Sequence, residues 1–246
     1  MAEFRIKIAG HVVQVQSVFD STRDYCGRYL TEENPEFFIQ VTREDMAREQ
    51  QLYYEEALEE GFRPRVFTDP FLDRAVIQRK MAEHLLEKGV LLVHGSGLAV
   101  DGEGFLFTAK SGTGKSTHTR FWMQVFGSRA AMVNDDKPFL RIEEGRVLLC
   151  GAPWSGKHGL DTNITVPLKG ICILERGLEN RIAPISPETA LPRLLHEACK
   201  PLENAREPLF QTLVESLAEK CPLWHMTCTK DREAAQIAYD AMAENA

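Results

Sequence analysis

The sequence predicts an α/β protein with a mixed β-sheet, preceded by an α+β extension at the N-terminus. From residue 90 onward, short apolar segments typical of strands alternate with longer segments in which apolar residues recur at helical spacing. Tight turns such as Asp101–Gly104 and Glu143–Gly145 join some of the strand segments, which favours antiparallel hairpins beside the parallel strands of βαβ units. We therefore divide the chain into an extension, residues 1–89, and a main domain, residues 90–246.

The extension carries patterns of secondary structure but none of catalytic chemistry. Apolar and polar residues alternate over 4–17 on both sides of a short turn, which predicts a β-hairpin, and 37–41 is a further strand segment. Thr42 and Asp45 have the spacing of a capping box, so we expect a helix from there to about residue 60, and a second helix over 71–88. We expect this part to cover or brace the main domain, or to offer a recognition surface.

The main domain is expected to contain most of the strands and four helices. The helical segments end at glycine or at a change of periodicity, and the strand segments are short apolar runs. Strands are expected at 90–93, 98–100, 105–107, 130–133, 139–142, 146–150, 169–175, 181–185 and 223–228, and helices at 115–126, 187–200, 206–220 and 231–243.

Composition excludes several classes of function. A net charge of −7 over 246 residues argues against a broad nucleic-acid-binding surface. No apolar run approaches the length of a membrane span, and the first ten residues lack the apolar core of a signal peptide. The six cysteines include no CxxC pair, which argues against a zinc site or a disulfide framework. We expect a cytoplasmic protein without nucleic-acid or membrane partners, and homo-oligomerisation stays open.

The sequence GFLFTAKSGTGKS, residues 104–116, has the strand, glycine loop and helix start of a phosphate-binding loop (P-loop). Glycines let backbone N–H groups approach an anion closely, and the start of a helix adds free donors and partial positive charge. A lysine at position 115 can reach the β- and γ-phosphates, and a serine at 116 can bind Mg²⁺. We therefore expect ATP and Mg²⁺ as ligands, and we assign the nucleotide to Ser111, Gly112, Thr113, Gly114, Lys115, Ser116 and Thr117.

One position departs from the usual loop pattern. Ala109 stands where a phosphate-binding loop has its first glycine. We interpret Ala109 as the last residue of the strand, with the tight turn formed by Gly112 and Gly114. The alternative is a turn that contains Gly-Lys-Ser by chance.

Asp135 and Asp136 follow a strand segment about one βαβ unit after the glycine loop. Because α/β proteins bind ligands at the carboxyl ends of strands, both carboxylates can face the phosphates, one of them as a ligand of Mg²⁺. The alternative is a solvated turn before Pro138.

Other polar residues near these motifs are candidates for the same site. His94 lies at a strand end, where a hydrogen-bonded structural histidine is the alternative, and Lys157 lies in a glycine-rich loop, where it could equally be a surface lysine. We expect the loop 151–159 to close over the site, so that Lys157 stabilises transition-state charge. Arg120 and Arg176 are weaker candidates for phosphate contacts, and His118 and His158 stay unassigned.

The order His94-Gly95, Ser111-Gly112-Thr113-Gly114-Lys115-Ser116, then Val133-Asn134-Asp135-Asp136 resembles the catalytic domain of HPr kinase/phosphorylase. The loop followed by the aspartate pair is also similar to the kinase motifs of ATP-dependent phosphoenolpyruvate carboxykinase. The resemblance covers about residues 90–176 and implies a nucleotide domain with a mixed sheet. It further implies that Asp135 is the general base toward a hydroxyl, that Asp136 is a metal ligand with Ser116, and that His94 orients Asp135.

Some features depart from these families. The chain is too short for a carboxykinase and shows no matching oxaloacetate site. Its N-terminal part does not resemble that of HPr kinase. The loop around Lys157 stands where HPr kinase has a glycine-rich signature.

We therefore expect a kinase that moves the γ-phosphate of ATP to a hydroxyl, on a small molecule or on a serine of a protein or peptide. The alternative is a nucleotide-binding regulatory or accessory protein with little turnover. Lys115, Ser116, Asp135, Asp136 and His94 favour the enzyme, and Ala109 favours the alternative.

Overall fold

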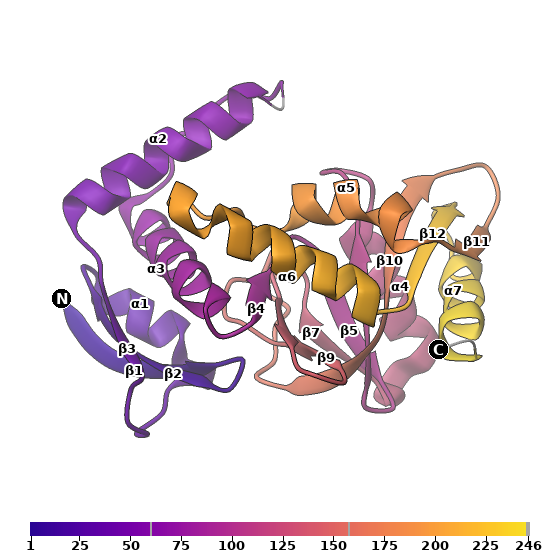
Figure 1. Ribbon diagram of the computed structural model, residues 1–246, viewed down its shortest axis with the longest axis horizontal. Coiled ribbons are helices and arrows are strands. Elements are labelled where there is room, and N and C mark those ends of the chain that lie inside the picture. Colours follow the sequence, from indigo (N-terminus) through magenta and orange to yellow (C-terminus); the bar gives the residue numbers. More distant parts are fainter. Residues whose placement is uncertain (60, 157, 245–246) are drawn as a thin grey trace. The chain divides into compact units, whose positions relative to one another are not determined.

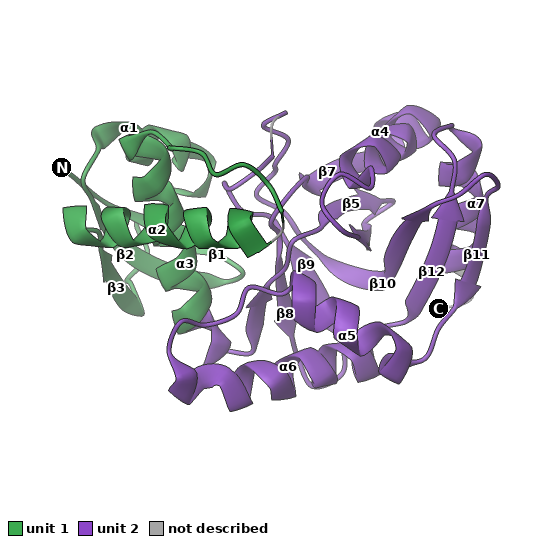
Figure 2. Cartoon of the chain, turned by 90° about the horizontal axis from the view of Figure 1, so that it is seen from above, with its two compact units in different colours: residues 1–84 green, residues 85–246 purple. Residues whose placement is uncertain are grey.

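The computed structural model describes residues 1–59, 61–156 and 158–244, and these form two compact units, residues 1–84 and 85–246 (Figures 1 and 2). Each unit has its own β-sheet. The structure divides the chain after residue 84, and the domain boundary that the sequence predicts after residue 89 stays a prediction.

Unit 1 contains a three-stranded sheet in the order β1-β2-β3. The predicted hairpin is present, because β1 (Ala2–Ile8) and β2 (His11–Ser17) pair antiparallel, and β3 (Phe37–Gln40) pairs parallel to β2. Two residues connect the hairpin, Ala9 with φ of 51° and Gly10 with φ of 86°, as the favoured two-residue turns require. The helices of this unit are α1 (Asp20–Tyr25), α2 (Arg43–Glu59) and α3 (Asp69–Leu86), the last of which crosses into unit 2.

Capping explains why α2 begins where it does, whereas a tertiary contact holds α1. The predicted capping box is confirmed: Thr42 accepts from the Asp45 N–H at 3.1 Å, and Asp45 accepts from the Thr42 N–H at 2.8 Å. The sequence did not predict α1, which is short and polar. The buried Asp73 of α3 accepts from the Val18 N–H at 2.9 Å and from the Thr22 hydroxyl at 2.5 Å, so α3 fixes this segment.

Unit 2 is built on a mixed sheet, as the sequence predicts. Among the described residues its strands follow the order β4-β8-β9-β10-β6-β5-β7, with β12 added to β10 and β11 added to β12. Strands β6, β10 and β12 pair parallel, and the other pairs are antiparallel. The strands are β4 (Val90–Leu92), β5 (Ser96–Val100), β6 (Glu103–Thr108), β7 (Ala130–Asn134), β8 (Phe139–Ile142), β9 (Val147–Cys150), β10 (Thr165–Arg176), β11 (Arg181–Pro184) and β12 (Leu223–Cys228).

Helices cover the sheet of unit 2 from two sides, and each side has its own apolar core. The helices are α4 (Lys115–Phe126), α5 (Pro187–Glu197), α6 (Glu207–Lys220) and α7 (Glu233–Glu244). Because side chains alternate along a strand, Phe105 and Phe107 of β6 belong to the core with Trp122 of α4, whereas Leu106 belongs to the core with Phe210 of α6. The two cores therefore fix the position and direction of β6 from both faces.

The carboxyl ends of several strands meet at one edge of this sheet. In the parallel pairings Ile173 of β10 lies opposite Thr108 of β6 and His225 of β12. Strand β7 is antiparallel to β5, which is antiparallel to β6, so β7 also ends at this edge. Ligands of α/β proteins bind at such edges, so this edge is the candidate location for a ligand-binding site.

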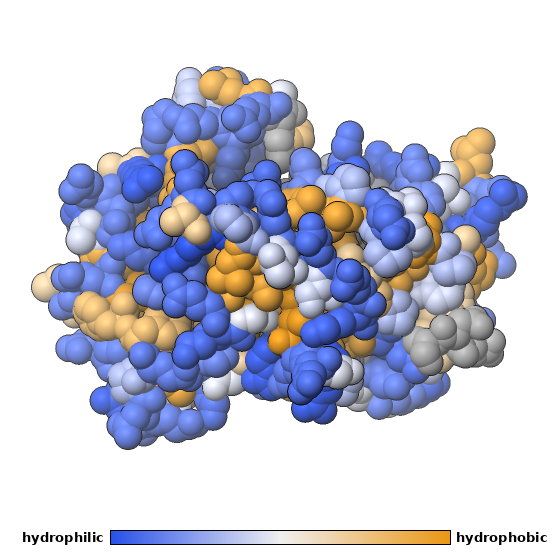
Figure 3. Space-filling model, viewed as in Figure 1, coloured by the Kyte–Doolittle hydropathy of each residue, from blue (hydrophilic) through white to orange (hydrophobic). Residues whose placement is uncertain are grey.

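Hydrophilic residues cover most of the face shown in Figure 3, with apolar side chains between them. Among the residues that the structure describes, no helix is long and apolar enough to cross a membrane.

The aromatic core beside α4 yields a test of the fold. Phe105 is fully buried, with its ring 4.9 Å from that of Trp122, so Phe105→Ala should lower the free energy of unfolding by about 3–5 kcal/mol. Leu178→Ala is the control, because Leu178 is fully exposed, and it should change stability by less than about 0.5 kcal/mol. Urea denaturation followed by circular dichroism measures both. Equal losses in the two variants would contradict the assigned core.

Candidate functional site

The glycine loop joins β6 to α4 at the carboxyl edge of the sheet. The strand ends at Thr108, one residue before Ala109, which the sequence suggested as its last residue, and the helix begins at Lys115. Gly112 and Gly114 have φ of 78° and 123°, and Ala109 is outside the left-handed region. The prediction that these two glycines form the turn is therefore confirmed, and the backbone at Ala109 does not require a glycine.

Polar side chains at the start of α4 contact the loop and the next strand. The Lys115 ammonium donates to the Ala109 carbonyl at 2.7 Å, and the side chain is almost buried. The Ser116 hydroxyl donates to the Asp135 carbonyl at 3.4 Å. Arg120, one turn further on, donates to the Ser116 carbonyl at 3.2 Å from the exposed side of the helix. Lys115 and Ser116 thus connect the glycine loop to the segment that follows β7.

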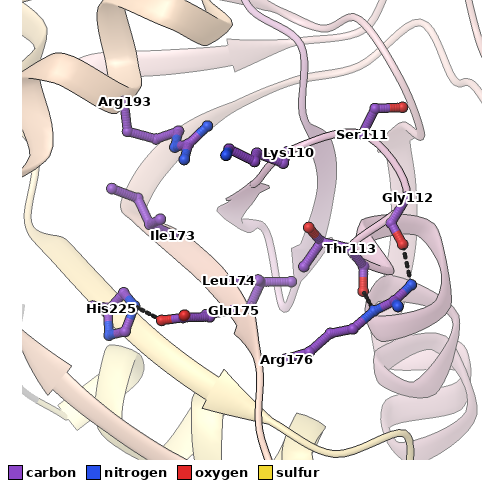
Figure 4. A pocket seen from close by; sticks show the side chains of 10 residues that line it. All are labelled: Lys110, Ser111, Gly112, Thr113, Ile173, Leu174, Glu175, Arg176, Arg193 and His225. Atoms are coloured by element: carbon purple, nitrogen blue, oxygen red, sulfur yellow. Dashed lines mark hydrogen bonds and ion pairs between the residues drawn. The ribbon is translucent and has the colours of Figure 1, made fainter. Parts of the chain in front are cut away.

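Arg176, the last residue of β10, holds the glycine loop from the opposite side (Figure 4). Its guanidinium donates from Nε to the Thr113 carbonyl at 3.1 Å and from Nη2 to the Gly112 carbonyl. The C=O and N–H groups of one trans peptide point in opposite directions. The N–H of Gly114 therefore points away from Arg176.

The buried Asn134 side chain, which is included in a sequence motif without being given a role, fixes the aspartate pair. Its Nδ2 donates to the Ala152 and Trp154 carbonyls at 2.7 and 3.2 Å, and its Oδ1 accepts from the N–H groups of Asp136 and Lys137 at 2.9 and 2.7 Å. The turn that carries the carboxylates and the loop after β9 are thus held by one amide.

Asp135 is a buried carboxylate with one unpartnered oxygen. Its side chain is 2% exposed, Oδ1 accepts from the Gly156 N–H at 2.5 Å, and Oδ2 has no hydrogen-bond partner among the described residues. Burial raises the pKa of Asp135, the Gly156 hydrogen bond opposes this rise, and the neighbouring Asp136 adds to it. A buried oxygen without a partner is costly and calls for an explanation, which makes Asp135 a candidate site residue.

His94 lies between Asp136 and a residue that the sequence did not identify. Its Nδ1 is 2.9 Å from Glu197 Oε2, and its Nε2 is 3.7 Å from Asp136 Oδ1. The family resemblance implies that His94 orients Asp135; the contact in the structure is with Asp136, and the implied role toward Asp135 stays a prediction. The physical reason is that the Gly95 N–H donates to the Asp136 carbonyl at 2.9 Å, which brings these two segments together.

Glu197 is buried at the end of α5 among basic side chains. Beside His94, it contacts Arg193 Nη1 at 3.2 Å and His196 Nδ1 at 3.3 Å. Burial by itself would raise the pKa of Glu197, but the hydrogen bond and charge of His94, together with the charges of Lys115 and His196, lower it overall. Glu197 lies 103 residues from His94 in the chain, and no short motif contains both.

A cavity of about 760 Å³ opens beside the glycine loop (Figure 4). Its walls come from the loop, from the ends of β10 and β12, and from α5. The lining residues are Lys110, Ser111, Gly112, Thr113, Ile173, Leu174, Glu175, Arg176, Arg193 and His225.

Two other candidates from the sequence, Lys157 and His118, lie apart from these contacts or outside the described residues. Lys157 lies outside the described residues, so its expected contact with phosphate stays a prediction. His118 is buried on α4, accepts from the Trp122 indole N–H at 3.0 Å, and packs edge-on against Phe107. Burial lowers its pKa to about 4, which makes it a neutral structural residue at neutral pH.

The buried His118 predicts a loss of stability in acid. The unfolded chain binds a proton near pH 6.5 and the folded chain only near pH 4, so the free energy of unfolding should fall by about 3 kcal/mol between these values. His118→Gln keeps the hydrogen-bond acceptor without the titration. The variant should be less stable than wild type at pH 7, and the difference should shrink as the pH falls to 4.5, as measured by urea denaturation. A difference that is constant with pH would contradict this.

No protein-family model matches the chain, and no curated protein matches it. Among solved structures, it is similar to the HPr(Ser) kinase/phosphatase from Coxiella burnetii, with 16% identity and a TM-score of 0.30 over 52% of this chain and 97% of that chain. Because identity and TM-score are both low, the roles proposed below rest on the residues of this chain.

Proposed function

We propose that this protein is a kinase that transfers the γ-phosphate of ATP to a hydroxyl acceptor with the help of Mg²⁺. The observation that carries the proposal is the unpartnered, buried Oδ2 of Asp135, next to the serine that follows the glycine loop. A strand, glycine loop and helix start would hold phosphates, and the adjacent carboxylates would serve the metal and the acceptor.

Residues 111–117, which comprise the end of the glycine loop and the first residues of α4, would hold the phosphate chain of ATP. The N–H of Gly114 points away from Arg176 and would be one donor, and the start of α4 would supply further backbone donors. The Lys115 ammonium now donates to the Ala109 carbonyl. A bound γ-phosphate would offer it an anionic partner instead, and charged hydrogen bonds are the stronger ones.

The side chains next to the loop have the chemistry to hold a magnesium ion, and Ser116 and Asp136 are proposed as its protein ligands. Ser116 and Asp136 supply oxygen ligands of the type that Mg²⁺ prefers, and the ion would neutralise charge on the phosphates. Among the described residues, no group of three or more His, Cys, Asp or Glu side chains is arranged to hold a metal by itself. Magnesium in kinases commonly uses one or two carboxylates together with the phosphates of its substrate.

Asp135 would accept the proton of the attacking hydroxyl. The acceptor oxygen forms a bond to the γ-phosphorus, the bond from that phosphorus to the leaving ADP breaks, and the proton passes to Asp135 Oδ2. His94, held by Glu197, would position Asp136. Lys157 is proposed as a cation that stabilises the transferred group.

The second candidate, a nucleotide-binding regulatory protein with little turnover, rested on Ala109. Since Ala109 is outside the left-handed region, a glycine is not required there, and this feature no longer favours the regulatory candidate.

The proposed role of Lys115 can be tested with Lys115→Met, which keeps much of the apolar stem. ADP formation should fall by about 10²–10³-fold, because one preorganised charge at the γ-phosphate is lost. Lys220→Gln is the control, since this lysine lies on α6 and donates to the Glu143 carbonyl. Turnover of Lys115→Met at the wild-type rate would refute the assignment of the loop.

The two aspartates should differ in their effects. Asp135→Asn should lower turnover by about 10²–10⁴-fold, the cost of losing a general base, with nearly unchanged affinity for a non-hydrolysable ATP analogue. Asp136→Asn should also weaken the Mg²⁺ dependence of analogue binding. Calorimetry at several Mg²⁺ concentrations and an assay of ADP measure these effects. If Asp135→Asn alters only the Mg²⁺ dependence, the two roles are reversed.

A further inference from the structure

The cavity beside the glycine loop continues along α5. A neighbouring hollow of about 750 Å³ shares Lys110, Ile173, Arg193 and His225 with it and adds His196. We call the basic side chains that line this continuous space the basic cleft; they are Lys110, Arg176, Arg193, His196 and His225. Its size is that of a site for a small molecule or a short peptide segment.

The charge of the basic cleft is opposite to that of the whole chain. The net charge of the chain is −7. Among the residues that line the cleft, one is acidic, Glu175, and its carboxylate lies 3.2 Å from His225 Nε2. Figure 4 shows the Lys110 and Arg193 side chains pointing toward one another from opposite walls. Two like charges that face each other across a cleft are destabilising, and an anion between them removes the repulsion.

Lys110 is the more available of these two cations. Within the described part of the chain, the Lys110 ammonium makes no hydrogen bond or ion pair. The Arg193 guanidinium, in contrast, forms an ion pair with Glu197, with Nη1 3.2 Å from Oε1. Lys110 comes before the residues assigned to the phosphates of ATP, and it faces α5 rather than the start of α4. The nucleotide and the cleft anion therefore use different groups.

The helix α5 connects the cleft to the proposed transfer site. Arg193 lines the cleft, and Glu197, one turn later on the same helix, contacts His94, which in turn lies near Asp136. Four residues of an α-helix rise by about 6 Å. A ligand whose anionic group binds between Lys110 and Arg193 can therefore extend toward the carboxylates.

We propose that the basic cleft binds an anionic group, a phosphate or carboxylate, of the hydroxyl acceptor. The acceptor class is then a negatively charged small molecule or peptide segment, which the net charge of the chain alone would not suggest. This assignment rests on the proposed kinase function, because only a second substrate needs a site beside that of ATP.

Calorimetric titration with inorganic phosphate tests the cleft after a non-hydrolysable ATP analogue and Mg²⁺ have filled the glycine loop. The loaded wild-type protein should bind phosphate saturably, and Lys110→Gln should weaken this binding about tenfold or more, because a charged hydrogen bond is lost. Arg193→Lys, which keeps the charge and removes the planar fork, should weaken it to a smaller extent. Lys220→Gln, the matched lysine outside the cleft, should bind phosphate as wild type does.

Three results would overturn the proposal. The loaded protein could bind no phosphate, Lys110→Gln could bind it as tightly as wild type, or Lys110→Gln could weaken the ATP analogue to the same degree, which would make the cleft part of the nucleotide site. Failure of the analogue to bind wild-type protein would instead refute the proposed function. In that case, phosphate titration of the nucleotide-free protein tests whether the cleft binds an anion. Weaker phosphate binding in Lys110→Gln supports an anion site in the cleft. Weaker binding in Lys115→Met but not in Lys110→Gln refutes it.

Discussion

The candidate site depends on the hydrogen bonds of one buried amide, the side chain of Asn134. It bonds to four backbone groups, two carbonyls of the loop after β9 and two N–H groups of the turn after β7. Its two donors and its acceptor oxygen are all used, so the amide has a single favourable orientation. Asp135 lies between these two segments, and its position follows from theirs. A substitution at Asn134 would leave several buried backbone groups without partners, each of which costs stability.

Strand β10 is the second element that organises the site. Its first residues pair with β9, and its later residues lie between β6 and β12. Strand β10 therefore fixes the position of β6, from which the glycine loop begins. It also ends in Arg176, which donates to the carbonyls of that loop. The apolar cores on both faces of the sheet fix this strand, so that the loop is attached to a rigid support.

The sequence predicts most elements of unit 2, because periodicity and turn residues are local signals. It predicts the mixed sheet, the strand, loop and helix around Lys115, and the turn at Gly112 and Gly114. It places the start of β10 too late, since Pro167 and Gly170 interrupt the strand pattern, although the pairing with β9 and β6 includes both residues.

The same local signals do not show which side chains meet. The partner of His94 could not be inferred, because Glu197 is more than 100 residues away and is brought to it by the hydrogen bond from the His94 N–H to the Glu197 carbonyl at 2.8 Å. Asn134 carries no motif of its own, and only the pairing of β7 with β5 and the path of the loop after β9 bring its partners within reach. Contacts of this kind are set by register and packing, which the order of residues does not state.

The placement of Arg193 has a consequence for how this protein can diverge. This arginine lines the cleft and also pairs with Glu197, which holds His94. A substitution that reshapes the cleft at this position also removes a countercharge from a buried carboxylate. Ligand preference and the placement of His94 are therefore not separable traits at position 193. New preferences are more accessible through Lys110 or Thr189, which line the same space without a contact to Glu197 among the described residues.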